Sequence, residues 1–265
     1  MKIALMDSGI GLLPAAAAVR RLRPDADLVL SCDPDGMPWG PRTPEDLTER
    51  ALAVARAAAA HRPGALIVAC NTASVHTLPA LRAELEPALP VIGTVPAIKP
   101  AAAGGGSVAI WATPATTGSP YQRGLIEEFA GSADVTEVPC PGLADAVEQA
   151  DESAIDRAVA AAAALTPRDV RALVLGCTHY ELVAERIRAA VTHPDRPSEL
   201  PPIVLHGSAG AVAAQALRRI GLPPAPDAVP SSRLTVLLSG TESPLPAEAL
   251  NYAEGRLLPT VTPVR

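Results

Sequence analysis

The sequence predicts an α/β protein built as two similar halves with mostly parallel sheets. Short apolar runs alternate with longer segments of helical pattern, which is typical of βαβ units. An apolar run that ends on a cysteine occurs twice, as Ala65–Cys70 and Ala172–Cys177, at an offset of 107 positions. A second pair of runs, Lys2–Ser8 and Ser107–Thr113, repeats at an offset of 105. Two matches at nearly one offset indicate an internal duplication.

Nine short apolar runs are predicted to form strands, because a short apolar run is the pattern of a strand in a covered parallel sheet. In chain order they are Lys2–Met6, Asp27–Ser31, Ala65–Ala69, Val91–Thr94, Val108–Ala112, Val135–Val138, Ala172–Leu175, Ile203–Leu205 and Leu234–Leu238. The longer segments between them predict helices. These are Leu13–Leu22, Pro44–His61, Leu78–Glu86, Pro120–Phe129, Glu152–Leu165, Leu182–Val191 and Ala209–Ile220.

The domain organisation follows from where the pattern changes. The glycine run Gly104–Gly106 stands where the second half begins and is suited to a linker. After Leu205 one helix and a final strand follow among proline-rich stretches. We expect this last part of the chain to cross back and complete the first half. The predicted domains are residues 1–98 with 207–265, and residues 99–206.

Composition and charge argue against several classes of protein. Hydrophobic residues make up 48% of the chain, which is ample for a core. The formal net charge of -6 argues against a nucleic-acid partner, because phosphate binding needs a basic face. There is no run of about 18 apolar residues, so no membrane span is expected. The first apolar run reaches Asp7 too early for a signal peptide.

The four cysteines, Cys32, Cys70, Cys140 and Cys177, are far apart in the sequence. A disulfide framework needs denser spacing, and a structural zinc site needs closely spaced cysteine pairs. We therefore expect free thiols, no metal site and a reducing cytoplasmic environment.

Polar residues follow many of the predicted strands, and functional groups of parallel α/β proteins collect at these carboxyl ends. Two facing halves would bring them together in one pocket. The pocket would contain thiols, hydroxyls and acids, without a cluster of lysine or arginine. Its members are Asp7-Ser8-Gly9, Asp33, Cys70-Asn71-Thr72, Thr113, Cys140 and Cys177-Thr178-His179.

Cys70 and Cys177 are candidate acid–base groups. A buried cysteine commonly acts as a small hydrophobic residue, but these two stand just past a strand and beside polar residues. A thiol has an ordinary pKa of about 8.5, and a helix N-terminus beside it stabilises the thiolate. Two thiols on opposite faces of a carbon can remove a proton from one side and return one to the other. Racemisation requires this arrangement.

Asp7 and His179 are candidate partners of the two thiols, because each can exchange a proton and orient the neighbouring sulfur. The alternatives are that Asp7 is a helix N-cap and that His179 is a hydrogen-bonded histidine at a helix start. A substrate carboxylate could be bound by side chains and N–H groups at helix starts. The candidates for that role are Ser8, Asn71, Thr72 and Thr178.

No cofactor is expected. The segment Asp7–Leu12 is not the G-x-G-x-x-G pattern of a dinucleotide site. Lys2 opens a strand, which leaves Lys99 as the other lysine for a Schiff base and argues against pyridoxal phosphate. The predicted partner is a small-molecule substrate.

Seven segments of the chain carry a resemblance to a known family. They are Asp7–Gly11, Pro38–Gly40, Cys70–Ser74, Pro90–Ala97, Ala112–Ser119, Cys140–Pro141 and Leu175–Tyr180. In their order and spacing, over roughly residues 1–210, the chain resembles the aspartate/glutamate racemase family, most closely the members that act on glutamate. The remainder of the chain matches only loosely.

The resemblance implies two α/β halves related by a pseudo-twofold axis, with the active site in the cleft between them. It also implies cofactor-independent racemisation of glutamate, which supplies D-glutamate for peptidoglycan. Cys70 would then act on the D-enantiomer with help from Asp7, and Cys177 on the L-enantiomer with help from His179. Glu148 matches a further assisting glutamate of the family. The implied substrate contacts are Asp7, Ser8, Trp39, Gly40, Asn71, Thr72, Thr178 and His179.

Some positions depart from the family pattern. Leu12 stands where a glycine is usual, Trp39 where a tyrosine is usual and Glu181 where a proline is usual. An aspartate is usual near His206. One alternative is therefore a paralogue that racemises aspartate or another acidic amino acid. The others are a catalytically silent binding protein and a redox protein with two facing thiols. The oligomeric state is open, with a homodimer as one option.

Overall fold

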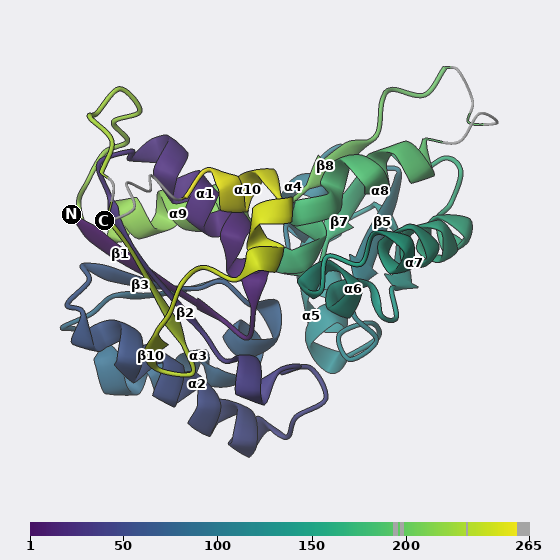
Figure 1. The fold of residues 1–265 in the computed structure, drawn as a ribbon. Helices are drawn as coiled ribbons and strands as arrows, with labels where there is room; N and C mark the ends of the chain where they lie inside the picture. Colours follow the sequence, from purple (N-terminus) through teal and green to yellow (C-terminus); the bar gives the residue numbers. More distant parts are fainter. Residues whose placement is uncertain (193–195, 197–198, 232, 259–265) are drawn as a thin grey trace. The chain divides into compact units, whose positions relative to one another are not determined.

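The computed structural model describes residues 1–192, 196, 199–231 and 233–258 (Figure 1). Contacts between residues divide the chain into two compact units. The first comprises Met1–Val95 with Ala209–Arg265, and the second comprises Pro96–Ser208. The predicted domain limits, 1–98 with 207–265 and 99–206, stay a prediction.

The first unit contains a mixed sheet with the strand order β10-β9-β2-β1-β3-β4. All neighbours pair in parallel except β10 and β9. The strands are β1 Lys2–Asp7, β2 Asp27–Cys32, β3 Ala65–Val68, β4 Val91–Gly93, β9 Leu234–Leu238 and β10 Thr241–Glu242. The central strand β3 is apolar throughout, because helices cover both faces of the sheet and all four of its residues are buried.

Helices of the first unit lie on both faces of this sheet (Figure 1). α2 and α3 pack together on one face, and α1 and α9 pack together on the other. Thr43 caps α2 by accepting the Asp46 N–H, which satisfies one of the first-turn donors. The helices are α1 Leu13–Leu22, α2 Pro44–Ala60, α3 Asn71–Leu85, α9 Ala209–Arg219 and α10 Ala253–Arg256, with short 3₁₀ segments at Ile10–Leu12, Pro34–Gly36 and Ala247–Asn251.

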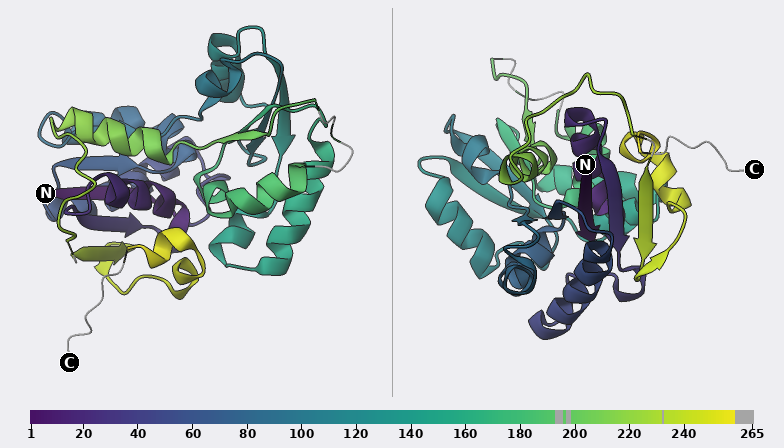
Figure 2. Two further views of the ribbon diagram at one scale, coloured as in Figure 1. Left: turned by 90° about the horizontal axis from the view of Figure 1, so that it is seen from above. Right: turned by 90° about the vertical axis from the view of Figure 1, so that its left-hand side faces the viewer.

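The second unit contains a parallel sheet with the strand order β6-β5-β7-β8. Its strands are β5 Ser107–Ala112, β6 Asp134–Pro139, β7 Ala172–Leu175 and β8 Val204–His206. In this unit α4 packs against α5, and α7 packs against both α6 and α8 (Figure 2). These helices are α4 Ile98–Ala102, α5 Pro120–Phe129, α6 Leu143–Glu148, α7 Glu152–Leu165 and α8 Ala184–Val191, and the 3₁₀ helix η3, Thr178–Val183, leads into α8.

The two sheets share a strand order. The order β6-β5-β7-β8 in the second unit repeats the order β2-β1-β3-β4 in the first. β5 begins 105 residues after β1, and β7 begins 107 residues after β3. The topology therefore supports the duplication that the two sequence repeats indicated. The pseudo-twofold relation of the halves stays a prediction.

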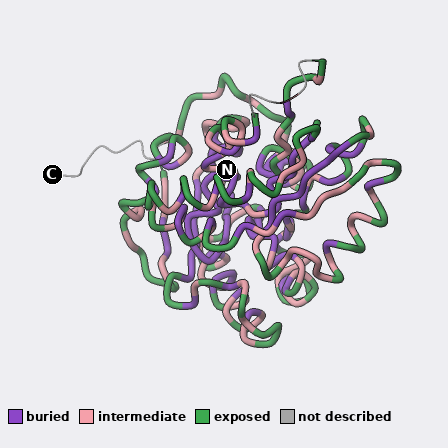
Figure 3. Tube along the Cα trace, turned by 90° about the vertical axis from the view of Figure 1, so that its right-hand side faces the viewer, coloured by how far each residue is buried: buried purple, intermediate pink, exposed green. Residues whose placement is uncertain are grey.

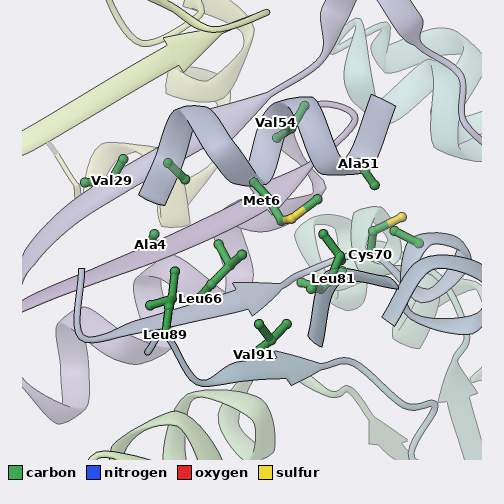
Figure 4. Packing of buried hydrophobic residues seen from close by; sticks show 14 of the residues in the cluster. Ala4, Met6, Val29, Ala51, Val54, Leu66, Cys70, Leu81, Leu89 and Val91 are labelled. Carbon is green, nitrogen blue, oxygen red and sulfur yellow. The ribbon is translucent and has the colours of Figure 1, made fainter. Parts of the chain in front are cut away.

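The buried cores consist of the strands and the helix faces that cover them (Figure 3). In the first unit, Ala51 and Val54 of α2 lie with Met6 and Cys70 in one apolar cluster (Figure 4). Alanine is frequent in this cluster, and its small side chain lets helix and sheet backbones approach closely. The α/β class with mostly parallel sheets is confirmed.

The start of α3, the start of α8 and the strand β10 differ from the prediction, and the short helices α4, α6 and α10 were not predicted. α3 begins at Asn71 rather than Leu78. The prediction missed its first turns because they contain several weak helix formers, Asn71, Thr72, Ser74 and Thr77, and because Pro79 lies inside the helix. α8 begins at Ala184 rather than Leu182, because η3 occupies Thr178–Val183. The two-residue strand β10 is too short to give a sequence pattern. Among the described residues, no helix is both long and apolar enough to cross a membrane.

Candidate active site

Cys70 and Cys177 occupy equivalent places in their two units. Each is the second residue after its strand and the residue immediately before a helix, with extended backbone angles of φ -142° for Cys70 and φ -130° for Cys177. The preceding residue is anchored in the same way in both units. The Ala69 N–H donates to the Met6 carbonyl at 2.9 Å, and the Gly176 N–H donates to the Trp111 carbonyl at 2.8 Å. Each thiol is therefore held beside the end of a central strand.

The backbone before Cys70 is fixed by a hydroxyl network. The Val68 carbonyl accepts the Thr94 hydroxyl at 2.7 Å and the Ser74 hydroxyl at 3.3 Å. The Thr94 N–H donates to the same Ser74 hydroxyl at 2.8 Å. Because this network joins the end of β3 to α3 and to the end of β4, it holds the backbone that positions the Cys70 thiol.

Asp7 and Ser8 lie at the same sheet edge as Cys70. Met6 pairs with Val68, so Asp7 and Ser8 leave β1 alongside the residues that leave β3. Asp7 is fully buried as the last residue of β1, and Gly9 is the N-cap of the following 3₁₀ helix. The alternative role for Asp7, a helix N-cap, is therefore wrong.

In the second unit, Cys177, His179 and Glu148 form a chain of contacts. The Cys177 sulfur lies 3.7 Å from His179 Nδ1, and His179 Nε2 lies 2.8 Å from Glu148 Oε2. A carboxylate can only accept a hydrogen bond, so Nε2 carries the proton and Nδ1 faces the thiol as an acceptor. This arrangement suits a histidine that exchanges a proton with the thiol.

Glu148 and the two acids near it in the sequence, Asp145 and Asp151, lie at different points of the helices in this region. Glu148 ends α6, whereas Asp151 caps α7 by accepting the Ala154 N–H at 3.0 Å. Asp145 is exposed in the first turn of α6. Of these three residues, Glu148 is the one that the structure places against His179.

Cys140 has a different environment from Cys70 and Cys177. Burial, together with the proximity of Cys177, raises the pKa of its thiol to about 12. Its Sγ donates to the Val138 carbonyl, and the Tyr180 hydroxyl donates to the Cys140 carbonyl at 3.4 Å. Cys140 is therefore a neutral thiol at physiological pH and unsuited to act as a base. All four cysteines are free thiols.

Trp39 is almost fully buried, and its side chain is hydrogen-bonded within the protein. The indole Nε1–H donates to Asp33 Oδ2 at 2.9 Å. The ring belongs to the apolar cluster that also contains Cys70. The large Trp39 side chain is thus packed into the core of the first unit, while Gly40 beside it is partly exposed.

The remaining candidate ligands stand at helix starts. Asn71 and Thr72 open α3, and Thr178 opens the 3₁₀ helix that follows Cys177. The N–H groups of a first helical turn point away from the helix and commonly bind carboxylates. The predicted residues thus form two groups. Asp7, Ser8, Trp39, Gly40, Cys70, Asn71 and Thr72 lie in the first unit, and Glu148, Cys177, Thr178 and His179 lie in the second.

Two further features escaped the site prediction. Arg50 of α2 donates to Asp33 at 3.3 Å, and a lone arginine on a helix gives no sequence signal for such a contact. Thr113 and Thr116 form a hydroxyl pair 3.2 Å apart just past β5, the strand to which Gly176 is anchored. Thr113 is one of the predicted pocket residues, whereas the sequence did not indicate its partner Thr116. Within the residues that the structure describes, no cluster of His, Cys, Asp or Glu is arranged to hold a metal ion.

The fold is that of an amino-acid racemase family. The family described as Asp/Glu/Hydantoin racemase matches residues 13–218. The chain therefore belongs to the Asp/Glu/Hydantoin racemase family.

Several relatives are similar along most of their length. The glutamate racemase of Roseiflexus sp. (strain RS-1) is 41% identical over 197 residues, which are 71% of this chain and 70% of that protein. Escherichia coli glutamate racemase, in a crystal structure with L-glutamate and the activator UDP-MurNAc-Ala, is 25% identical with a TM-score of 0.75, covering 97% of this chain and 92% of that one. Thermus thermophilus glutamate racemase, in complex with β-chloro-D-alanine, is 28% identical with a TM-score of 0.68 and the same coverage of 97% and 92%.

Proposed function

We propose that this protein interconverts L-glutamate and D-glutamate with two thiols as the acid–base groups. Membership of the racemase family supports the reaction class. The similarity to glutamate racemases, one of them with bound L-glutamate, supports the substrate. The matching placement of Cys70 and Cys177 at the ends of corresponding strands supports the assignment of the thiols.

In the proposed reaction, the Cys70 thiolate removes the α-proton of D-glutamate. The C–H bond breaks, its electron pair stays on the α-carbon, and an S–H bond forms. The Cys177 thiol then donates its proton to the opposite face, which yields L-glutamate and leaves Cys177 as the thiolate. The reverse reaction begins at Cys177, so no proton is consumed in a full cycle.

Asp7 and His179 assist the two thiols in this proposal. Glu148 holds the His179 ring through the 2.8 Å contact, so that Nδ1 faces the Cys177 sulfur. This chain of three residues is the observation that carries the catalytic assignment, because a merely structural cysteine would not need an oriented histidine. Ser8, Asn71, Thr72, Thr178 and the Trp39–Gly40 segment would bind the substrate with Asp7 and His179.

The substrate is tested by incubating the protein with single L-amino acids and following optical rotation. We expect L-glutamate to lose its rotation. If only L-aspartate or another acidic amino acid does so, the protein is a paralogue of altered specificity. If none does so, the silent binding protein becomes the better assignment. Full turnover after exhaustive dialysis with a chelator is expected for a reaction without a cofactor.

The cellular role follows from the proposed reaction. We propose that the protein supplies D-glutamate for peptidoglycan in the cytoplasm, where free thiols persist. Expression in a D-glutamate auxotroph should restore growth without added D-glutamate. A homodimer is also proposed, and a molar mass near 27.1 kDa by light scattering would contradict it.

A further inference from the structure

Asp33 connects two segments that are predicted to bind substrate. Its backbone N–H donates to the Ser8 carbonyl at 3.1 Å. Its side chain accepts the Trp39 indole N–H at 2.9 Å. The Ser8 turn and the Trp39–Gly40 segment thus meet at a single residue, which lies just past the end of β2.

Both carboxylate oxygens of Asp33 are engaged. Oδ1 accepts the Gly36 N–H at 3.1 Å, whereas Oδ2 accepts from Trp39 and, at 3.3 Å, from Arg50. The residue is only 6% exposed, so the Arg50 guanidinium offsets part of the cost of burying its charge. A Cβ at Gly36 would lie 1.9 Å from Oδ2 and 2.4 Å from the guanidinium, so a side chain at this position would displace the Asp33–Arg50 pair.

A ring of charges ties the same loop to α2. Arg50 also contacts Asp46 at 3.3 Å, and Asp46 pairs with Arg42. Arg42 in turn donates to the Gly36 carbonyl. The loop that carries Trp39 is therefore held at Asp33 from one side and at α2 from the other.

We propose that Asp33 is the positioning residue that presents the Trp39–Gly40 backbone and the Ser8 turn to the substrate, with Trp39 as a fixed packing group. An indole has one polar hydrogen, and Trp39 donates it to Asp33. The Trp39 side chain therefore takes no polar part in choosing the substrate. This inference rests on the proposed function for its kinetic test but not for its spectroscopic one.

The kinetic test is Asp33→Asn, with Asp25→Asn as the matched control. Gly36 and Trp39 donate to different oxygens of Asp33, and asparagine replaces one of these oxygens with an NH2 group, so one of the two donors loses its acceptor. We expect the KM for glutamate to rise about tenfold, the equivalent of one charged hydrogen bond, while kcat changes less than about threefold. Asp25→Asn weakens the ion pair with Arg23 before the start of β2, at the opposite end of that strand from Asp33, and should leave both constants unchanged. An unchanged KM in a folded Asp33→Asn variant overturns the proposal.

The spectroscopic test uses the fluorescence of Trp39. The chain has two tryptophans, and Trp111 lies in the other unit, hydrogen-bonded to Thr166. In a Trp111→Phe background, we expect Asp33→Asn to shift the Trp39 emission to longer wavelength and to increase quenching by acrylamide. Identical Trp39 spectra with Asp33 in place and in the Asp33→Asn variant would contradict the proposal that Asp33 holds the Trp39 side chain in place. This readout needs no turnover. The role of Asp33 can therefore be disproved while racemisation is confirmed, and racemisation can be disproved while the role of Asp33 is confirmed.

A second variant covers the case in which Asp33→Asn does not fold. Trp39→Phe keeps an aromatic ring at this position and leaves the Asp33 carboxylate in place, but it removes the N–H donor. We expect its ratio of kcat/KM for glutamate to that for aspartate to equal the wild-type ratio within about twofold. A larger change in this ratio would show that the indole selects the substrate, and the proposal would then be wrong.

Discussion

At the scale of single residues, His179 contacts the Cys177 sulfur through one ring nitrogen and the Glu148 carboxylate through the other. The carboxylate fixes the ring tautomer and stabilises the ring when it takes up a proton. We therefore propose that Glu148 acts through His179 and not on the substrate.

Glu148→Gln tests this role. An amide has no charge to stabilise a protonated His179, so we expect kcat to fall about tenfold, the equivalent of one charged hydrogen bond. Glu152→Gln is the matched control, because Glu152 is an exposed residue of α7 whose ion-pair partner is Arg186 of α8. Steady-state kinetics of both variants check the prediction. Equal kcat values for Glu148→Gln and wild type would remove Glu148 from the assisting group.

Replacing either thiol should abolish most of the activity. A hydroxyl is a far weaker acid than a thiol, so Cys70→Ser and Cys177→Ser should each slow racemisation by at least about 100-fold. Cys140→Ser is the control, because that buried thiol is unsuited to act as a base and its hydroxyl can still donate to Val138. Racemisation at the wild-type rate by either catalytic variant would contradict a two-thiol reaction.

At the scale of elements, the strand ends place the thiols. Gly176 lies directly before Cys177, and a Cβ there would lie 2.7 Å from the Trp111 carbonyl oxygen, which is too close for any real contact. Backbone cannot yield as a flexible side chain can. The close approach of β7 to β5 therefore requires glycine at this position.

Gly176→Ala should consequently lower both stability and activity. The clash must push the end of β7 away from β5 and displace the Cys177 thiol, so we expect a destabilisation of about 1–3 kcal/mol, which is typical of overpacking. Gly64→Ala is the matched control, because its Cβ would meet only the Lys2 carbonyl at 3.7 Å, an ordinary contact. Urea unfolding and turnover of both variants are compared. Equal losses in the two variants would contradict the prediction.

Elements with a strong local pattern were predicted closely. Strands Ala172–Leu175 and Leu234–Leu238 and helices Leu13–Leu22 and Glu152–Leu165 have the predicted limits. Their pattern is local, because a covered parallel strand is a continuous apolar run and a helix repeats its apolar face. The polar first turns of α3 carry no such pattern, so the start of that helix was missed.

Contacts between distant residues could not be predicted in this way. Glu148 was named by resemblance, but its contact with His179 joins residues 31 positions apart. The bond between Arg50 and Asp33 depends on how α2 packs beside β2. Such contacts are set by tertiary packing, and the sequence alone gives only the list of candidate residues.

At the scale of the whole molecule, the buried thiol of Cys140 makes stability depend on alkaline pH. Burial raises the pKa of this thiol from 9.0 to about 12, so the folded state binds the proton more tightly than the unfolded chain. The contribution to the free energy of unfolding is full below about pH 9 and is lost as the pH rises toward about 12. Burial also raises the pKa of Tyr180, which acts in the same direction.

Urea unfolding between pH 8 and 11 measures this effect. We expect the free energy of unfolding to fall above about pH 9, with Cys140 contributing up to about 1.4 kcal/mol per pH unit. Cys140→Ala should show a shallower decline over the same range. Parallel pH profiles for the variant and wild type would contradict the assignment.

The repeated strand order places a cysteine at the same point of two corresponding strands, with different neighbours after each. Cys70 is followed by Asn71 and Thr72, whereas Cys177 is followed by Thr178 and His179. A duplicated fold thus provides two differently surrounded thiols, as the two enantiomers of one substrate require.

Exchange of the α-proton in D₂O tests the central claim most directly. Each enantiomer of glutamate is incubated with the protein, and deuterium at the α-carbon is followed by NMR or mass spectrometry. The account predicts that deuterium enters from both enantiomers and accompanies inversion, and that Cys70→Ser and Cys177→Ser suppress inversion. If neither enantiomer exchanges its α-proton over a wide range of concentrations, the assignment as a two-thiol glutamate racemase is wrong.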